Sequence, residues 1–96
     1  MLLLPEHASA AKRSVAVKFN HSQAKKVTIA GSFNGWHPES TPLRCIQPGE
    51  WMTELILEAG VYEYRFLVDG QWADDPVAQR SISNNFGSRN FLMEIS

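Results

Sequence analysis

Alternation of apolar and polar residues predicts most of the secondary structure of this chain. Apolar side chains at every second position are typical of a strand with one buried face. The pattern begins at Val15, Val17 and Phe19, and similar segments follow at 26–30, 43–46, 51–58, 61–68, 71–73 and 90–95. Turn-forming residues separate these segments, and none of them has a helical period over three turns. The pattern predicts an all-β protein, most simply an immunoglobulin-like β-sandwich of about seven short antiparallel strands.

An Asp-Gly pair at 69–70 gives the clearest turn signal. Such a pair is typical of a two-residue type I′ hairpin, because both turn positions need positive φ. Counting outward from the turn opposes Leu67 with Trp72 and Arg65 with Asp74. The large aromatic residues of the strand before the turn alternate with Leu67 and Arg65, so we expect them in the core. Trp72 is therefore expected on the outer face of the sheet, close to Arg65.

Two tryptophans are expected outside the core. Trp72 lies on the predicted outer face, and Trp36 lies in a loop rich in turn residues, whereas Trp51 shares a strand face with Leu55 and Leu57 and is expected to be buried. A single exposed aromatic residue is common and often only covers a loop. Two of them, together with Arg65 and the asparagines at 84, 85 and 90, are typical of sugar binding. Indole faces stack on the apolar face of a pyranose ring, while guanidinium and amide groups hydrogen-bond its hydroxyls.

Length and composition indicate one small domain. The chain has 96 residues, 44% of them hydrophobic and 20% charged, which is enough for one core. Its net charge of -1 argues against binding nucleic acid or an anionic membrane. The apolar run at residues 1–4 is broken by Pro5 and is too short for a membrane span or a secretory signal. We interpret residues 1–11 as a flexible N-terminal tail and residues 12–96 as the domain, and we expect a cytoplasmic protein.

No catalytic or metal-binding motif is recognisable. The single cysteine, Cys45, and three scattered histidines lack the spacing of metal ligands. Asp74 and Asp75 are adjacent and would point to opposite faces of a strand, so they cannot flank one bond as glycosidase carboxylates do. A role in capping the turn before Pro76 is preferred. We therefore expect a protein that is not an enzyme and that binds no metal or cofactor.

Four motifs follow one another along residues 13–95: GSFNGW at 31–36, GVYEYRF at 60–66, VDGQW at 68–72 and NFGSRN at 85–90. In this order they resemble carbohydrate-binding module family 48, with the closest likeness to the glycogen-binding domain of the AMP-activated protein kinase β subunit. The resemblance covers nearly the whole chain. It implies the same sandwich fold that the alternation predicts.

The resemblance also implies which residues bind an α-1,4-glucan. Trp36 and Trp72 correspond to two tryptophans that hold the glucan from two sides. Arg65 stands where the kinase module has a lysine, and its planar guanidinium replaces a compact ammonium group. The remaining implied contacts come from the last loop: Phe86 in place of an aliphatic residue that enters the sugar coil, Ser88 in place of a threonine, and a matching Asn90.

The sequence thus predicts a non-catalytic module that binds glycogen or related α-1,4-glucans by stacking glucose rings on two exposed tryptophans. An alternative is a protein-interaction domain that docks on a kinase or an amylolytic enzyme through the same face. A third hypothesis is a carbohydrate module severed from a larger amylolytic enzyme. Glycogen or an α-glucan oligosaccharide is the expected partner under the first and third hypotheses.

Overall fold

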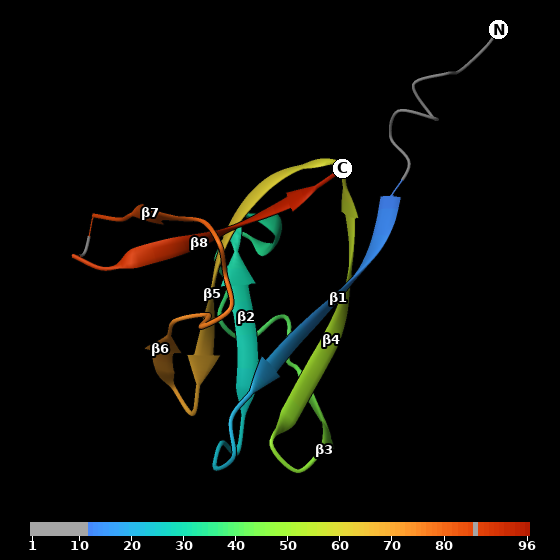
Figure 1. Ribbon diagram of the computed structural model, residues 1–96, viewed down its shortest axis with the longest axis vertical. Coiled ribbons are helices and arrows are strands. Elements are labelled where there is room, and N and C mark those ends of the chain that lie inside the picture. Colours follow the sequence, from blue (N-terminus) through green and yellow to red (C-terminus); the bar gives the residue numbers. More distant parts are fainter. Residues whose placement is uncertain (1–11, 86) are drawn as a thin grey trace, which may run out of the picture.

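Two antiparallel sheets face each other in this computed structural model, which describes residues 12–85 and 87–96 (Figure 1). The three-stranded sheet has the order β1-β4-β3, and the other sheet has the order β2-β5-β8-β7, with β6 pairing β5 in addition. This arrangement confirms the expected all-β sandwich. The tail expected at residues 1–11 and the site residue Phe86 lie outside the described residues.

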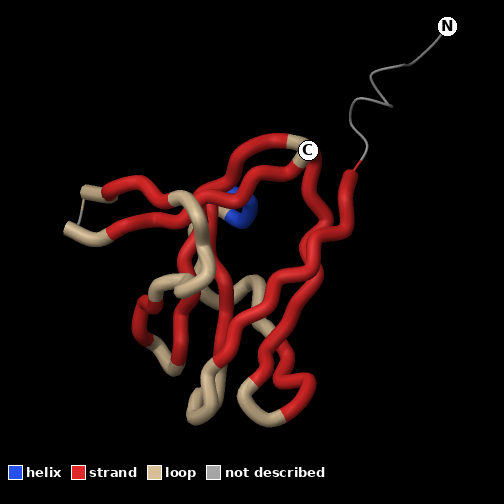
Figure 2. The backbone as a smooth tube through the Cα atoms, in the orientation of Figure 1, coloured by secondary structure: helices blue, strands red, loops and turns tan. Residues whose placement is uncertain are grey.

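The elements have the following bounds: β1 Lys12–Asn20, β2 Val27–Gly31, η1 Ser32–Asn34, β3 Arg44–Gln47, β4 Glu50–Glu58, β5 Gly60–Val68, β6 Gln71–Ala73, β7 Ser81–Ser83 and β8 Arg89–Ile95. Figure 2 shows that strands dominate the described part of the chain, in which helix is confined to the single turn η1. In the part of the chain that the structure describes, no helix is long and apolar enough to cross a membrane.

The core lies between the two sheets, with Phe66 of β5 fully buried at its centre. The ring of Phe66 lies 4.5 Å from the ring of Phe19, which comes from β1 of the other sheet. Alternate positions of the facing strands supply most of the rest of the core: Val17, Val27, Ile29, Trp51, Leu55, Leu57, Tyr64 and Phe91. Each such side chain stabilises the fold by about 1.5–3 kcal/mol when it leaves water. The predicted burial of Trp51 is confirmed.

The β5–β6 hairpin has the predicted turn and register. Asp69 and Gly70 have φ values of 50° and 86°, as a type I′ turn requires. Leu67 is opposite Trp72, but the ladder ends at Ala73, so the expected ladder pair of Arg65 with Asp74 does not form. The chain leaves the sheet after Ala73, and the contact between those two side chains takes another form, described below.

Strand β7 was not predicted from the sequence, because no alternating segment was recognised between residues 73 and 90. It is three residues long and pairs only with β8. Its two serines flank Ile82, which is 46% exposed. A short edge strand with its apolar side chain facing outward lacks the alternation that marks a half-buried strand.

Candidate functional site

A cavity of about 520 Å³ opens on the outer face of the five-stranded sheet. Five of the six predicted site residues line this cavity: Trp36, Arg65, Trp72, Ser88 and Asn90. The sixth, Phe86, lies outside the described residues. The structure therefore brings together side chains that are spread over more than half of the sequence.

The cavity forms where two strands separate along one edge of β5. Strand β8 pairs with β5 from Gly60 to Tyr64, and β6 pairs with it from Phe66 to Val68. Arg65 lies between these two ladders. After β6 the chain leaves β5, forms β7 and returns at β8, and residues 82–85 and 88 of this connection build one wall of the cavity.

The loop after β2 fixes the position of Trp36. The side chain of Asn34 accepts a hydrogen bond from the backbone N–H of Gly31 at 3.0 Å. Its amide nitrogen donates to the carbonyl of Ile29 at 3.1 Å and to the hydroxyl of Thr41 at 3.0 Å. The backbone N–H of Trp36 donates to the Gly31 carbonyl at 2.8 Å. The hydrogen bonds of the Asn34 side-chain amide therefore close a compact loop, and this loop holds the Trp36 indole at the cavity.

Trp36 itself has a φ of 61°, in the left-handed region that bulky residues rarely adopt. Residues in such conformations concentrate at functional sites, where the surrounding structure holds them in place. Here that structure is the loop closed by Asn34, and the side chain of Trp36 is half-buried.

Trp72 lies on β6, on the outer face that the hairpin register predicted. It is 48% exposed, in contrast to the buried Trp51. Trp36, Trp72 and Ile82 supply the large apolar surfaces of the cavity lining. The hydroxyl groups of serines and the amide groups of asparagines line the cavity beside these apolar surfaces.

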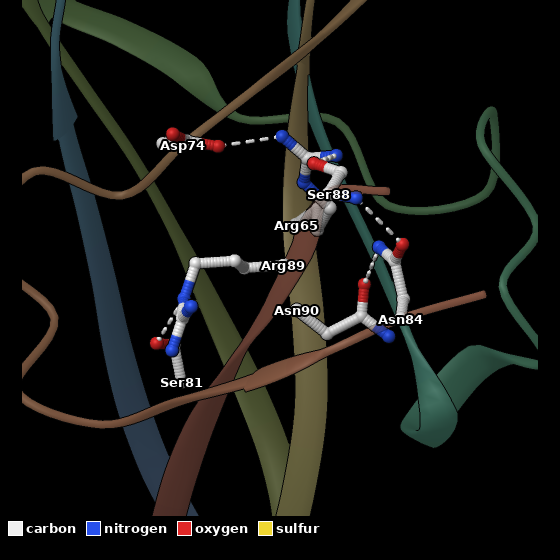
Figure 3. A network of polar contacts seen from close by, with 7 residues as sticks. All are labelled: Arg65, Asp74, Ser81, Asn84, Ser88, Arg89 and Asn90. Atoms are coloured by element: carbon white, nitrogen blue, oxygen red, sulfur yellow. Dashed lines mark hydrogen bonds and ion pairs between the residues drawn. The ribbon is translucent and has the colours of Figure 1, made fainter. Parts of the chain in front are cut away.

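Arg65 joins the two ends of the segment that walls the cavity (Figure 3). One terminal nitrogen, Nη1, donates to Oγ of Ser88 at 2.8 Å, just before β8. The other, Nη2, forms an ion pair of 2.6 Å with Oδ1 of Asp74, just after β6. The guanidinium side chain is only 12% exposed, and its buried Nε has no hydrogen-bond partner among the described residues. Arg65 and Asp74 are thus neighbours as predicted, through an ion pair rather than a ladder.

A chain of hydrogen-bonded amide groups continues from Ser88 to Asn84 and Asn90 (Figure 3). The backbone N–H of Ser88 donates to Oδ1 of Asn84 at 3.1 Å, and the Asn84 amide donates to Oδ1 of Asn90 at 3.0 Å. The Asn90 amide then donates to Oε1 of Glu63 at 3.0 Å. These bonds orient the amides, so their remaining donors and acceptors have defined directions.

Three lining residues were not singled out from the sequence: Glu63, Ile82 and Ser83. Glu63 precedes Arg65 by two positions on β5, so strand alternation already places both on the outer face. Ile82 and Ser83 lie on β7, for which the sequence gives no alternation signal. Asn84 and Asn85, noted as part of an amide cluster, also line the cavity.

Asp74 and Asp75 make separate structural contacts. Asp75 accepts hydrogen bonds from the hydroxyl of Tyr64 at 2.5 Å and from the backbone N–H of Val77 at 3.1 Å, the latter as expected for turn capping. Burial raises the pKa of Tyr64, and the hydrogen bond to Asp75 raises it further. Within residues 12–85 and 87–96, no group of three or more His, Cys, Asp or Glu side chains is placed to hold a metal ion.

Comparison with known proteins adds independent information. The family described as the glycogen recognition site of AMP-activated protein kinase matches residues 13–96. Protein PTST homolog 2, chloroplastic, of Arabidopsis thaliana is 36% identical over 94 residues, which cover 95% of this chain and 17% of that protein. The 5′-AMP-activated protein kinase subunit beta-2 of Homo sapiens is 36% identical over 72 residues, 74% of this chain and 25% of the subunit.

A third relative, the 5′-AMP-activated protein kinase subunit beta-1 of Sus scrofa, is 31% identical over 90 residues, 94% of this chain and 70% of that sequence. The chain thus spans 17% of the plant relative's length and 25% of the human subunit's length.

Proposed function

The chain belongs to the family of the glycogen recognition site of AMP-activated protein kinase, and on this basis we propose that it is a non-catalytic module that binds glycogen or related α-1,4-glucans. The observation that carries the proposal is the cavity itself. It combines two tryptophans with guanidinium, hydroxyl and amide groups on one face of the sheet. Glucose rings offer apolar faces and hydroxyl edges, and both have counterparts in this lining.

In this proposal Trp36 and Trp72 stack on glucose rings, and Arg65, Ser88 and Asn90 bind hydroxyls. The ion pair of Arg65 with Asp74 and its bond to Ser88 hold the guanidinium in place before the sugar arrives. Groups that are already oriented lose less entropy on binding. Contact between Phe86 and the sugar coil remains a prediction, since Phe86 lies outside the described residues.

The affinity for a single oligosaccharide is expected to be modest. Two stacking contacts and a few hydroxyl bonds, less the cost of ordering a flexible sugar, correspond to a Kd of roughly 10 μM to 1 mM. Binding to a branched polymer would be tighter if several modules act together.

A kinase or amylolytic enzyme as partner is a second candidate, supported by the relatives that are named kinase subunits. In that case the cavity face would meet a protein surface, and the chain would capture a discrete protein without responding to glucans. We also propose a cytoplasmic location, whereas the name of one relative, Protein PTST homolog 2, describes a chloroplastic protein.

Replacing Trp72 by alanine tests the proposal. Because the side chain is 48% exposed, we expect the free energy of unfolding to change by no more than about 1 kcal/mol. Calorimetric titration with maltoheptaose should show at least about tenfold weaker binding, or about 1.4 kcal/mol.

Ile56→Ala is the matched control, because Ile56 is 58% exposed and lies on the other sheet. This variant should bind maltoheptaose like the wild type. Unchanged affinity in Trp72→Ala would contradict the proposal, and so would unfolding of that variant, since the indole would then be a packing residue.

A further inference from the structure

Glu63 gives the cavity an unbalanced negative charge. Glu63 and Arg65 are the charged side chains in the cavity lining that the structure describes. The charge of Arg65 is matched by Asp74, whose Oδ1 lies 2.6 Å from Nη2. Glu63 instead accepts a hydrogen bond from the neutral amide of Asn90, and no ion pair of Glu63 occurs within residues 12–85 and 87–96. The charges of these three groups therefore sum to -1.

The position of Glu63 suits it to contact a sugar. The side chain is half-buried on the outer face of β5, two residues from Arg65. The bond from Asn90 to Oε1 holds the carboxylate in one orientation and leaves further acceptor positions on its two oxygens. Hydroxyl groups that donate to a carboxylate form shorter and stronger hydrogen bonds than those that donate to a neutral acceptor.

We propose that Glu63 contacts the bound sugar and makes this cavity selective for uncharged glucans over glucans that carry phosphate esters. The inference rests on the proposed function, since it concerns the same site. A phosphate ester carries a charge of about -1.5 to -2 at pH 7 and would face the Glu63 carboxylate in a partly desolvated site. The hydroxyl groups of neutral glucose units would instead donate hydrogen bonds to the Glu63 carboxylate.

Arg65 does not reverse this preference. Its positive charge is already matched by Asp74, which forms an ion pair with Nη2, and Nη1 donates to Ser88, so the guanidinium offers a phosphate hydrogen-bond donors but no unmatched charge. The side chain is also only 12% exposed. Arg89, which follows Ser88 in the sequence, is not among the residues that line the cavity, and its Nε donates to Oγ of Ser81.

The test compares two ligands and three proteins. The ligands are β-cyclodextrin, a ring of α-1,4-linked glucose, and the same ring with a phosphate on every glucose, so that each unit presented to the site is charged. The proteins are the wild type, Glu63→Gln and Glu54→Gln. Glutamine keeps the size of Glu63 and an acceptor for Asn90 while removing the charge. Glu54 is exposed on β4 of the other sheet, so its variant changes the net charge equally without touching the cavity.

We expect the wild type to bind the phosphorylated ring at least about tenfold more weakly than β-cyclodextrin at low salt, with the difference shrinking as salt screens the charges. Glu63→Gln should reduce this ratio by about fivefold, and Glu54→Gln should leave it unchanged. A penalty due only to the bulk of the phosphate would persist in Glu63→Gln and would overturn the inference.

Equal binding of the two rings by the wild type, or tighter binding of the phosphorylated ring, would also overturn the inference while leaving the proposed function intact. If the wild type binds neither ring, the proposed function fails and the inference fails with it.

Discussion

Gly31 is extended, with a φ of -171° that any residue could adopt, so backbone freedom does not explain a glycine at this position. Space does. A Cβ atom on Gly31 would lie 2.3 Å from the carbonyl oxygen of Glu63 and 3.0 Å from Cβ of Tyr64. The close approach lets the loop that carries Trp36 turn directly over β5. At the residue scale, the absence of a side chain at Gly31 therefore positions an aromatic side chain at the cavity.

Gly31→Ala should accordingly destabilise the protein by about 3 kcal/mol, because backbone atoms must move to admit the methyl group. Gly35→Ala is the comparison: its Cβ would meet nothing within 4 Å, and only its φ of 67° is unfavourable for alanine. That conformation costs about 1 kcal/mol. Urea denaturation of both variants measures the difference, and a Gly31→Ala variant no less stable than Gly35→Ala would show that the close approach is unimportant.

At the scale of elements, the segment that follows β6 is tied back to β5 by two adjacent carboxylates. Asp74 pairs with Arg65 on the outer face, and Asp75 accepts a hydrogen bond from the buried Tyr64 hydroxyl. These two neighbouring residues therefore contact different side chains of β5, Arg65 and Tyr64. The tie matters for function because this segment forms one wall of the cavity.

The Tyr64 contact predicts a dependence of stability on alkaline pH. Burial and the bond to Asp75 raise the pKa of Tyr64, while the unfolded chain releases the tyrosine proton near pH 10. Below about pH 10 the contribution of the contact to stability is fully present. Above it, unfolding releases a proton, so the free energy of unfolding falls by up to about 1.4 kcal/mol per pH unit.

Tyr64→Phe should remove this part of the alkaline slope and lower stability at neutral pH by about 1–2 kcal/mol, because a bond to a charged group is lost. Urea denaturation from pH 8 to pH 11 measures both effects. Tyr62→Phe, which keeps Tyr64, should retain the wild-type slope. Identical slopes in Tyr64→Phe and the wild type would refute the assignment.

At the scale of the whole molecule, features set by local sequence could be predicted and features set by the path of a loop could not. Alternation identified the strands with one buried face, and the Asp-Gly turn set the register that places Trp72 outside the core. Strand β7 and the end of the β6 ladder at Ala73 depend on where the chain runs from residue 74 to residue 88. No local pattern in that segment records its path.

The candidate site likewise combines residues that could be predicted from the sequence with residues that could not. The motifs and the register together indicated Trp36, Arg65 and Trp72, which do line one cavity. Ile82 enters the lining only because β7 folds beside β8, and the ion pair of Arg65 with Asp74 replaces the expected ladder. Glu63 could have been found, because the alternation that exposes Arg65 exposes Glu63 as well.

The distribution of the three tryptophans over the molecule gives a direct test of the central claim that the cavity binds α-glucans. Trp36 and Trp72 line the cavity, while Trp51 is buried in the core. Intrinsic tryptophan fluorescence can therefore report binding without a label. A variant with Trp36→Phe and Trp72→Phe keeps only Trp51 and serves as the control.

The one measurement is a fluorescence titration with maltoheptaose, with cellohexaose as the comparison sugar. The account predicts a saturable change for the wild type with maltoheptaose only, and none for the variant that keeps Trp51 alone. No change with either sugar up to about 10 mM, a concentration that would reveal a site of about -4 kcal/mol, would contradict it. An equal change in the variant that keeps only Trp51 would contradict it too, because the signal would then come from the core.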